Sequence, residues 1–212
     1  MEIKVTSGHL KNARTKAVVS FVFQEDKIFS EEVLAIDKLL DGNISELKRE
    51  IKFSGKDGEV LVVPTFGKLK FEYVVLIGAG SKRKANIDKA RILGSTVVKQ
   101  MKKMRVSRFL IDGEALLPIR EPEDKIAQAL VEGVILGNYS FDKYKSQKSE
   151  YKIKELQVRV KRRFKTAAEE RVEVGKILAE SQNFTRDLVN EPGNVITPVK
   201  LAEIAKEIAE EA

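Results

Sequence analysis

The stretch with the clearest chemical potential is a glycine turn that follows an apolar run. Residues 74–83 read VVLIGAGSKR, so a predicted strand leads into Gly78-Ala79-Gly80 and then into a basic segment that opens a helix. Backbone N–H groups at such a turn, a helix N-terminus and nearby cations all favour a bound phosphate. The segment Gly78–Arg83 could therefore bind the phosphate of a nucleotide.

The same turn lacks parts of a dinucleotide site. That site needs a third glycine, where Arg83 stands here, and an acidic residue about 20 positions further on, at the end of the next strand. Neither requirement is met. We favour a tight connection between a strand and a helix, and nucleotide binding remains an alternative.

A second candidate is the basic strip, residues 141–165, which holds ten Lys or Arg against three Asp or Glu. The whole chain has a formal net charge of +7, and the strip accounts for all of it. Clustered cations bind phosphates, and Tyr139, Phe141 and Tyr144 could stack on bases. We favour the other interpretation: a solvated face whose lysines protect an exposed strand from edge-to-edge pairing, with the aromatic rings anchoring a loop to the core. Nucleic acid is thus an alternative partner.

Other residues with chemical potential do not form a recognisable catalytic set. The chain has no cysteine, which excludes disulfides and thiolate metal sites. Its one histidine is His9. No G-x-S-x-G motif surrounds a serine, Ser7, Ser20 and Ser81 included. Carboxylates cluster at predicted helix starts and on charged helix faces, where solvated side chains are expected. These clusters are Glu121/Glu123/Asp124, Glu169/Glu170 and Glu210/Glu211. We therefore predict no catalytic, metal-binding or cofactor-binding residue.

Hydrophobic patterning indicates an α/β domain over residues 1–163. At 212 residues and 42% hydrophobic, the chain can bury one core and an appendage. Apolar runs typical of strands covered on both faces alternate with amphipathic helical patterns, and one further run alternates like a half-exposed strand. The predicted strands are 17–23, 60–63, 73–77, 106–111 and the half-exposed 151–160, and the predicted helices are 30–40, 43–50, 86–104 and 122–137. This order predicts a three-layer fold, a sheet between two layers of helices.

Residues 164–212 differ in character. A long helical pattern covers 166–188, with Ala167, Val174, Ile177, Leu178, Ser181 and Leu188 near one face. It stops at Asn190-Glu191-Pro192-Gly193, because proline and glycine break helices. Thr197 and Pro198 then begin a last helix, whose apolar stripe is Leu201, Ile204, Ala205, Ile208 and Ala209. A short helix is stable mainly through packing of such a face, so we expect a partner to cover it.

Two segments resemble a known family. Residues 132–145 read EGVILGNYSFDKYK and residues 183–198 read NFTRDLVNEPGNVITP. They are similar to the segment that closes the N-terminal domain of leucyl (cytosol) aminopeptidases and to the connection that follows it. The resemblance implies a macro-domain-like mixed sheet flanked by helices, then a long linker helix and a short helix that starts the catalytic domain. The likeness to macro domains makes ADP-ribose the nucleotide that the alternative site at Gly78–Arg83 would bind.

The resemblance also implies a function for the whole enzyme. These enzymes are cytoplasmic hexamers that release N-terminal amino acids from peptides with two divalent metals, zinc, manganese or magnesium. Their lysine, aspartate and glutamate ligands lie in motifs resembling KG-TFDSGG and NTDAEGR, and neither occurs here. The resemblance thus identifies the chain as the non-catalytic N-terminal domain, inactive alone and serving assembly and active-site access. We expect its partners to be its own catalytic domain and further copies of the enzyme. The chain contains no stretch of about 18 apolar residues, and its start lacks signal-peptide character, so we expect no membrane association and a cytoplasmic location.

Overall fold

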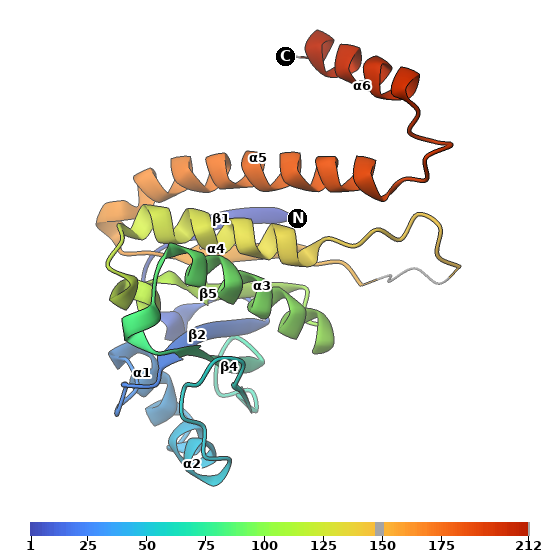
Figure 1. Ribbon diagram of the computed structural model, residues 1–212. Helices are drawn as coiled ribbons and strands as arrows, with labels where there is room; N and C mark the ends of the chain where they lie inside the picture. The colour runs from blue at the N-terminus through green and yellow to red at the C-terminus, as the bar shows by residue number, and fades with distance from the viewer. Residues whose placement is uncertain (147–150, 212) are drawn as a thin grey trace.

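The fold is built on one mixed six-stranded sheet with the strand order β1-β6-β5-β2-β4-β3. The computed structural model describes residues 1–146 and 151–210 fully, and the backbone of residue 211 (Figure 1). Strand β3 is antiparallel to β4, and the other neighbouring strands are parallel. The strands are β1 (Glu2–Thr6), β2 (Ala17–Phe23), β3 (Val60–Pro64), β4 (Tyr73–Gly80), β5 (Arg108–Asp112) and β6 (Glu155–Arg159).

Helices cover both faces of the sheet, which confirms the three-layer prediction. On one face lie α1 (Glu31–Leu39) and α2 (Asn43–Glu50), and on the other lie α3 (Ile87–Lys103) and α4 (Glu123–Asn138). The long helix α5 (Lys165–Asn190) lies outside α4, and α6 (Pro198–Glu211) stands away from the rest (Figure 1). Short 3-10 turns are η1 (Leu10–Asn12), η2 (Lys82–Lys84), η3 (Gly113–Ile119) and η4 (Arg162–Phe164).

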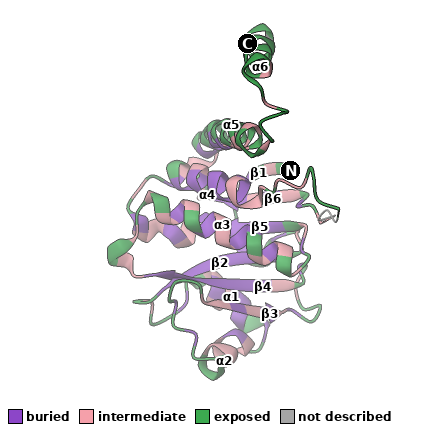
Figure 2. Ribbon diagram, turned by 45° about the vertical axis from the view of Figure 1, so that its right-hand side comes forward, coloured by how far each residue is buried: buried purple, intermediate pink, exposed green. Residues whose placement is uncertain are grey.

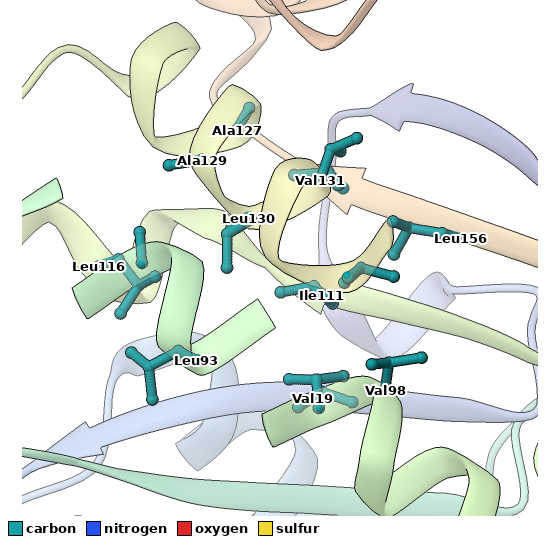
Figure 3. Close-up of a cluster of buried hydrophobic side chains, with 14 of the residues drawn as sticks. Val19, Leu93, Val98, Ile111, Leu116, Ala127, Ala129, Leu130, Val131 and Leu156 are labelled. Carbon is teal, nitrogen blue, oxygen red and sulfur yellow. The ribbon is translucent and has the colours of Figure 1, made fainter. Parts of the chain in front are cut away.

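The core consists of two apolar layers separated by the sheet. Strand β2 is buried along its whole length and contributes Val19 to one layer and Val18 to the other. In the larger layer, Leu130 and Val131 of α4 lie near Ile111 of β5 (Figure 3). Each large apolar side chain that is fully buried contributes about 1.5–3 kcal/mol, so these layers stabilise the fold.

The helices begin at the capping residues that the sequence predicted. The side chain of Ser30 accepts a hydrogen bond from the N–H of Val33, Asn86 accepts from Lys89, and Thr197 accepts from Lys200. Each side chain satisfies an N–H group that has no partner within its helix. Helix α4 differs slightly from the prediction, because it begins one residue after Pro122 and continues to Asn138.

The prediction for residues 151–160 was partly wrong. Strand β6 pairs with β1 on one side and β5 on the other, so it is an interior strand and its cations do not protect an edge. Leu156 and Val158 lie in the core, as the alternation predicted, but Arg159 is buried as well. Sequence alternation reports on the faces of a strand and carries no information about its neighbours in the sheet.

Candidate functional site

The glycines of the Gly78–Arg83 turn allow a neighbouring loop to approach closely. A Cβ atom on Gly78 would lie 1.9 Å from the carbonyl oxygen of Lys56. One on Gly80, which has a φ of +73°, would lie 2.6 Å from the carboxylate of Asp57. Real Cβ atoms do not come so close to other atoms, so the packing of residues 54–58 accounts for both glycines. This supports the favoured interpretation, a strand-to-helix connection.

The anion position at this turn is filled by a carboxylate of the chain itself. Glu25 accepts hydrogen bonds from the hydroxyl of Ser81 over 2.7 Å and from the N–H of Lys82 over 3.0 Å. The Ser81 hydroxyl, and next the Lys82 N–H, lower the pKa of Glu25 below its ordinary value. A phosphate at these N–H groups would have to displace Glu25, so the nucleotide hypothesis loses its main support.

The basic strip is not one continuous cationic surface. Four of its lysines pair with carboxylates: Lys143 with Glu191, Lys145 with Asp142, Lys161 with Glu123 and Lys165 with Glu169. Arg159 is buried, and Lys148 lies outside the described residues. Strand β6 also separates the cations before it from those after it, and these two groups lie at opposite ends of the strand. A groove that follows a phosphate backbone would need them side by side.

The aromatic residues beside the strip anchor a loop. The phenol of Tyr139 donates to Asp187 over 2.8 Å, and that of Tyr144 donates to Glu191. The rings of Phe141 and Tyr144 lie 5.9 Å apart. Burial, and next the hydrogen bond to Asp187, raise the pKa of Tyr139 above its ordinary value. The prediction was partly wrong, because these residues anchor the loop to α5 and to Glu191 and not to the core.

His9 and the serines make structural contacts. The imidazole Nδ1 of His9 lies 2.8 Å from Glu32 on the surface. Ser20 donates from a buried hydroxyl to Asp112 over 3.0 Å. A serine nucleophile needs a base that accepts its proton and is oriented by a third group, and His9 contacts neither Ser7 nor Ser20.

Sequence reasoning missed a buried ionic cluster at the carboxyl edge of the sheet. The guanidinium of Arg159 donates to Asp112, contacts Glu114 over 3.2 Å and Glu32 over 3.3 Å, and donates to the carbonyl of Gly8 over 2.6 Å. Burial raises the pKa values of Asp112 and Glu114, and Arg159 opposes this rise. The cluster connects chain segments at the carboxyl ends of four strands, so its role is structural. Arg159 stands at a polar position of the β6 alternation, beside the core residue Val158, so the pattern carries no signal of its burial.

The carboxylate clusters do not fit a pair of metal ions. Asp124 pairs with Arg171, Glu121 with Lys125, and Glu123 accepts from the N–H of Lys161. The side chain of Glu211 lies outside the described residues. In the parts of the chain that the structure describes, no three His, Asp or Glu side chains converge on a position for a metal.

Helix α5 packs on the domain through small side chains. The buried positions are Ala168, Val172, Gly175 and Ala179, one face of the first half of the helix. A Cβ on Gly175 would lie 2.9 Å from Gln128, so the glycine lets α5 approach α4 closely. The apolar row noted in the sequence lies on the opposite face. We call its exposed members Val174, Ile177 and Leu178, together with the exposed Phe184, which the row did not include, the outer face of α5.

Helix α6 is likewise uncovered. Its described residues include none that is buried (Figure 2). Leu201 and Ile208 are each 49% exposed, although they belong to the apolar stripe. Within the described residues no element buries this stripe, and the partner expected to cover it stays a prediction. Two apolar helix faces, the outer face of α5 and the stripe of α6, therefore meet solvent.

Comparison with known proteins gives one consistent family. Residues 18–148 match the sequence pattern described as "Cytosol aminopeptidase family, N-terminal domain". The chain is 68% identical to a "Probable cytosol aminopeptidase" of Persephonella marina and 39% identical to one of Aquifex aeolicus, each over the whole chain. It spans about two fifths of these relatives, 42% and 41% of their lengths.

Solved structures share the fold. A mutant of tomato leucine aminopeptidase superposes with a TM-score of 0.83 at 20% identity, covering 100% of this chain and 42% of that one. The bottromycin maturation enzyme BotP, in complex with Mn, gives a TM-score of 0.68 at 21% identity, covering 93% of this chain and 36% of that one.

None of the helices in the described residues has both the length and the apolar character needed to cross a bilayer.

Proposed function

This chain belongs to the cytosol aminopeptidase family, as its N-terminal domain, and from this premise we propose that it is the non-catalytic half of a two-metal exopeptidase. The whole enzyme releases N-terminal amino acids from peptides in the cytoplasm. Its two divalent ions bind in the C-terminal half, and this chain alone is inactive. The domain supports assembly of the enzyme into a hexamer and frames access to the active site.

The observation that carries the proposal is the pair of uncovered apolar helix faces. Ile177 and Leu178 on the outer face of α5 are 61% and 55% exposed. Exposed apolar patches of this kind mark interaction surfaces. Covering each such side chain would contribute about 1.5–3 kcal/mol. This chain spans 42% of the Persephonella marina relative, and we assign the remaining part of such a relative as the partner of both faces.

The test is association in trans. The 212-residue chain is mixed with the separately produced C-terminal part of the Persephonella marina relative, and binding is measured by calorimetry. Hydrolysis of leucine p-nitroanilide with manganese is measured alongside. We expect a complex, with hydrolysis only when the C-terminal part is present. Ile177→Glu should weaken the complex about tenfold or more, because a charge replaces a buried apolar side chain.

The matched control is Gln182→Glu, which adds the same charge at another exposed position of α5. It should leave the affinity unchanged. Hydrolysis by the chain alone, or equal affinity for Ile177→Glu and the control, would argue against the proposal.

A further inference from the structure

The second half of α5 places no residue in the core. Its buried positions end at Ala179, and among its last eleven residues Leu188 is the half-buried apolar one. The hydrogen bonds that attach this stretch come from the end of α4 and the loop after it. The first and second halves of α5 are therefore held by different kinds of contact.

Part of this second attachment caps α4. The last carbonyl groups of a helix have no partner within it. Asn183 of α5 donates to the carbonyl of Ile135 over 3.4 Å, and Arg186 donates to that of Leu136 over 3.2 Å. A cation at this end also interacts favourably with the helix dipole. The end of α4 thus fixes Asn183 and Arg186 in place.

The remaining contacts centre on Tyr139. Its ring lies 3.9 Å from the guanidinium carbon of Arg186. Its hydroxyl donates to Asp187 over 2.8 Å and accepts from Asn190 over 3.1 Å. One side chain thereby contacts three positions in the last two turns of α5.

A second group of contacts lies at Glu191, the residue after the end of α5. Glu191 accepts from Lys143 over 2.6 Å and also from the phenol of Tyr144. Glu191 directly precedes Pro192-Gly193, where the chain turns toward α6. We name the contacts of Tyr139, Lys143 and Tyr144 with α5 and Glu191 the polar latch. It joins the two segments, 132–145 and 183–198, that carry the family resemblance.

We propose that Tyr139 is a positioning residue. Through the polar latch it fixes the direction of α5, and thereby the position of the catalytic half that follows this helix. The importance of this direction for catalysis rests on the proposed function. Small displacements far from reacting groups can cost up to about 10²-fold in rate, so the direction of this helix affects turnover. Because the latch is polar and on the surface, it can be weakened without emptying the core.

The first test measures the direction of α5 in the 212-residue chain. The chain has no cysteine, so spin labels can be placed at Lys99→Cys on α3 and Val189→Cys at the end of α5, both exposed positions. Tyr139→Phe keeps the ring and removes both hydroxyl contacts. The double variant Tyr139→Phe with Glu191→Gln weakens the whole latch. We expect a narrow distribution of distances between the two labels in the parent and a broader distribution in each variant.

A matched label pair supplies the control. Glu173→Cys lies on the half of α5 that packs through Ala168 and Val172. The distribution of distances between its label and that at Lys99→Cys should therefore stay narrow in every variant. Amide exchange over residues 185–191 should rise about tenfold, the factor that 1.4 kcal/mol gives in an equilibrium constant. An unchanged melting curve would show that the variants fold. Unchanged label distances at Val189→Cys would overturn the proposal.

The second test measures catalysis. The chain is joined to the C-terminal part of the Persephonella marina relative, and kcat and KM for leucine p-nitroanilide are compared. Tyr139→Phe should lower kcat about tenfold with little change in KM or in melting temperature. Broader label distances with unchanged kcat would overturn the positioning role. Failure of the two parts to dock at all would overturn the proposed function and the positioning role together, and the trans titration detects that case separately.

Discussion

The guanidinium Nη1 of Arg159 lies 2.7 Å from the carboxylate Oδ1 of Asp112, and these side chains are only 7% and 2% exposed. The pair lies where β5 and β6 end, and it joins loops that follow four different strands. An ion pair this deep is costly to break, because the remaining charge is left without a partner or water.

Arg159→Met should therefore destabilise the domain strongly. The free energy of unfolding should fall by about 3–5 kcal/mol, because Asp112, whose pKa burial already raises, loses its buried counterion and must then take up a proton or hold an unpaired charge. Urea denaturation measures the change. Adding Asp112→Asn should restore part of the loss.

The control for this pair is Arg162→Met, which removes the same side chain at an exposed position. Its effect should lie within about 0.5 kcal/mol of zero. Equal effects of the Arg159 and Arg162 substitutions would contradict the assigned role of the cluster.

Gly78→Ala should destabilise the fold through a direct clash. The added Cβ would lie 1.9 Å from the Lys56 carbonyl oxygen, which belongs to rigid backbone. Overpacking of this kind typically costs about 1–3 kcal/mol, occasionally more. Gly193→Ala is the control, because a Cβ there meets no atom within 4 Å. A thermal melt in which both variants matched the parent would show that Gly78 is not required for packing.

Ser81→Ala should raise the pKa of Glu25 toward its ordinary value of 4.5, because the Ser81 hydroxyl is the largest cause of its depression. A carboxyl group with a lowered pKa stabilises the folded state above the pKa of the unfolded chain. This contribution disappears as pH falls through the folded-state pKa. The variant should thus be less stable than the parent at pH 7 and equal to it well below pH 4.5. Titration of the Glu25 carboxyl carbon by NMR checks the pKa, and a midpoint that does not move would refute the assignment.

Removing α6 should leave the domain intact. The described residues of α6 include none that is buried, so a chain ending at Gly193 should keep the melting temperature of the 212-residue chain. A chain ending at Phe164 should melt lower, because it also loses the buried Val172 and Ala179 of α5. A large loss on removing α6 alone would mean that its stripe is covered within this chain.

Local signals in the sequence predicted most elements of the fold. Apolar runs located β2, β3 and β4, and Ser30, Asn86 and Thr197 located three helix starts. These signals depend on neighbouring residues only, through the direction of side chains and the N–H groups of a first turn.

Features that depend on distant residues could not be predicted in this way. Strand β6 lies between β1 and β5, and it pairs with β1 although the two strands are about 150 positions apart in the sequence. The burial of Arg159 follows from that place, since Gly8 and Glu32 reach it only in the folded sheet. The face of α5 that packs on α4 is set by small residues, which carry little hydrophobic signal.

The central claim is that the outer face of α5 and the stripe of α6 are one side of an interface with the C-terminal half. A cryo-electron microscopy structure of the chain joined to the C-terminal part of the Persephonella marina relative tests it most directly. We predict that Ile177, Leu178, Leu201 and Ile208 become buried against that part. If these four side chains stay exposed while the joined polypeptide hydrolyses its substrate, the claim is wrong.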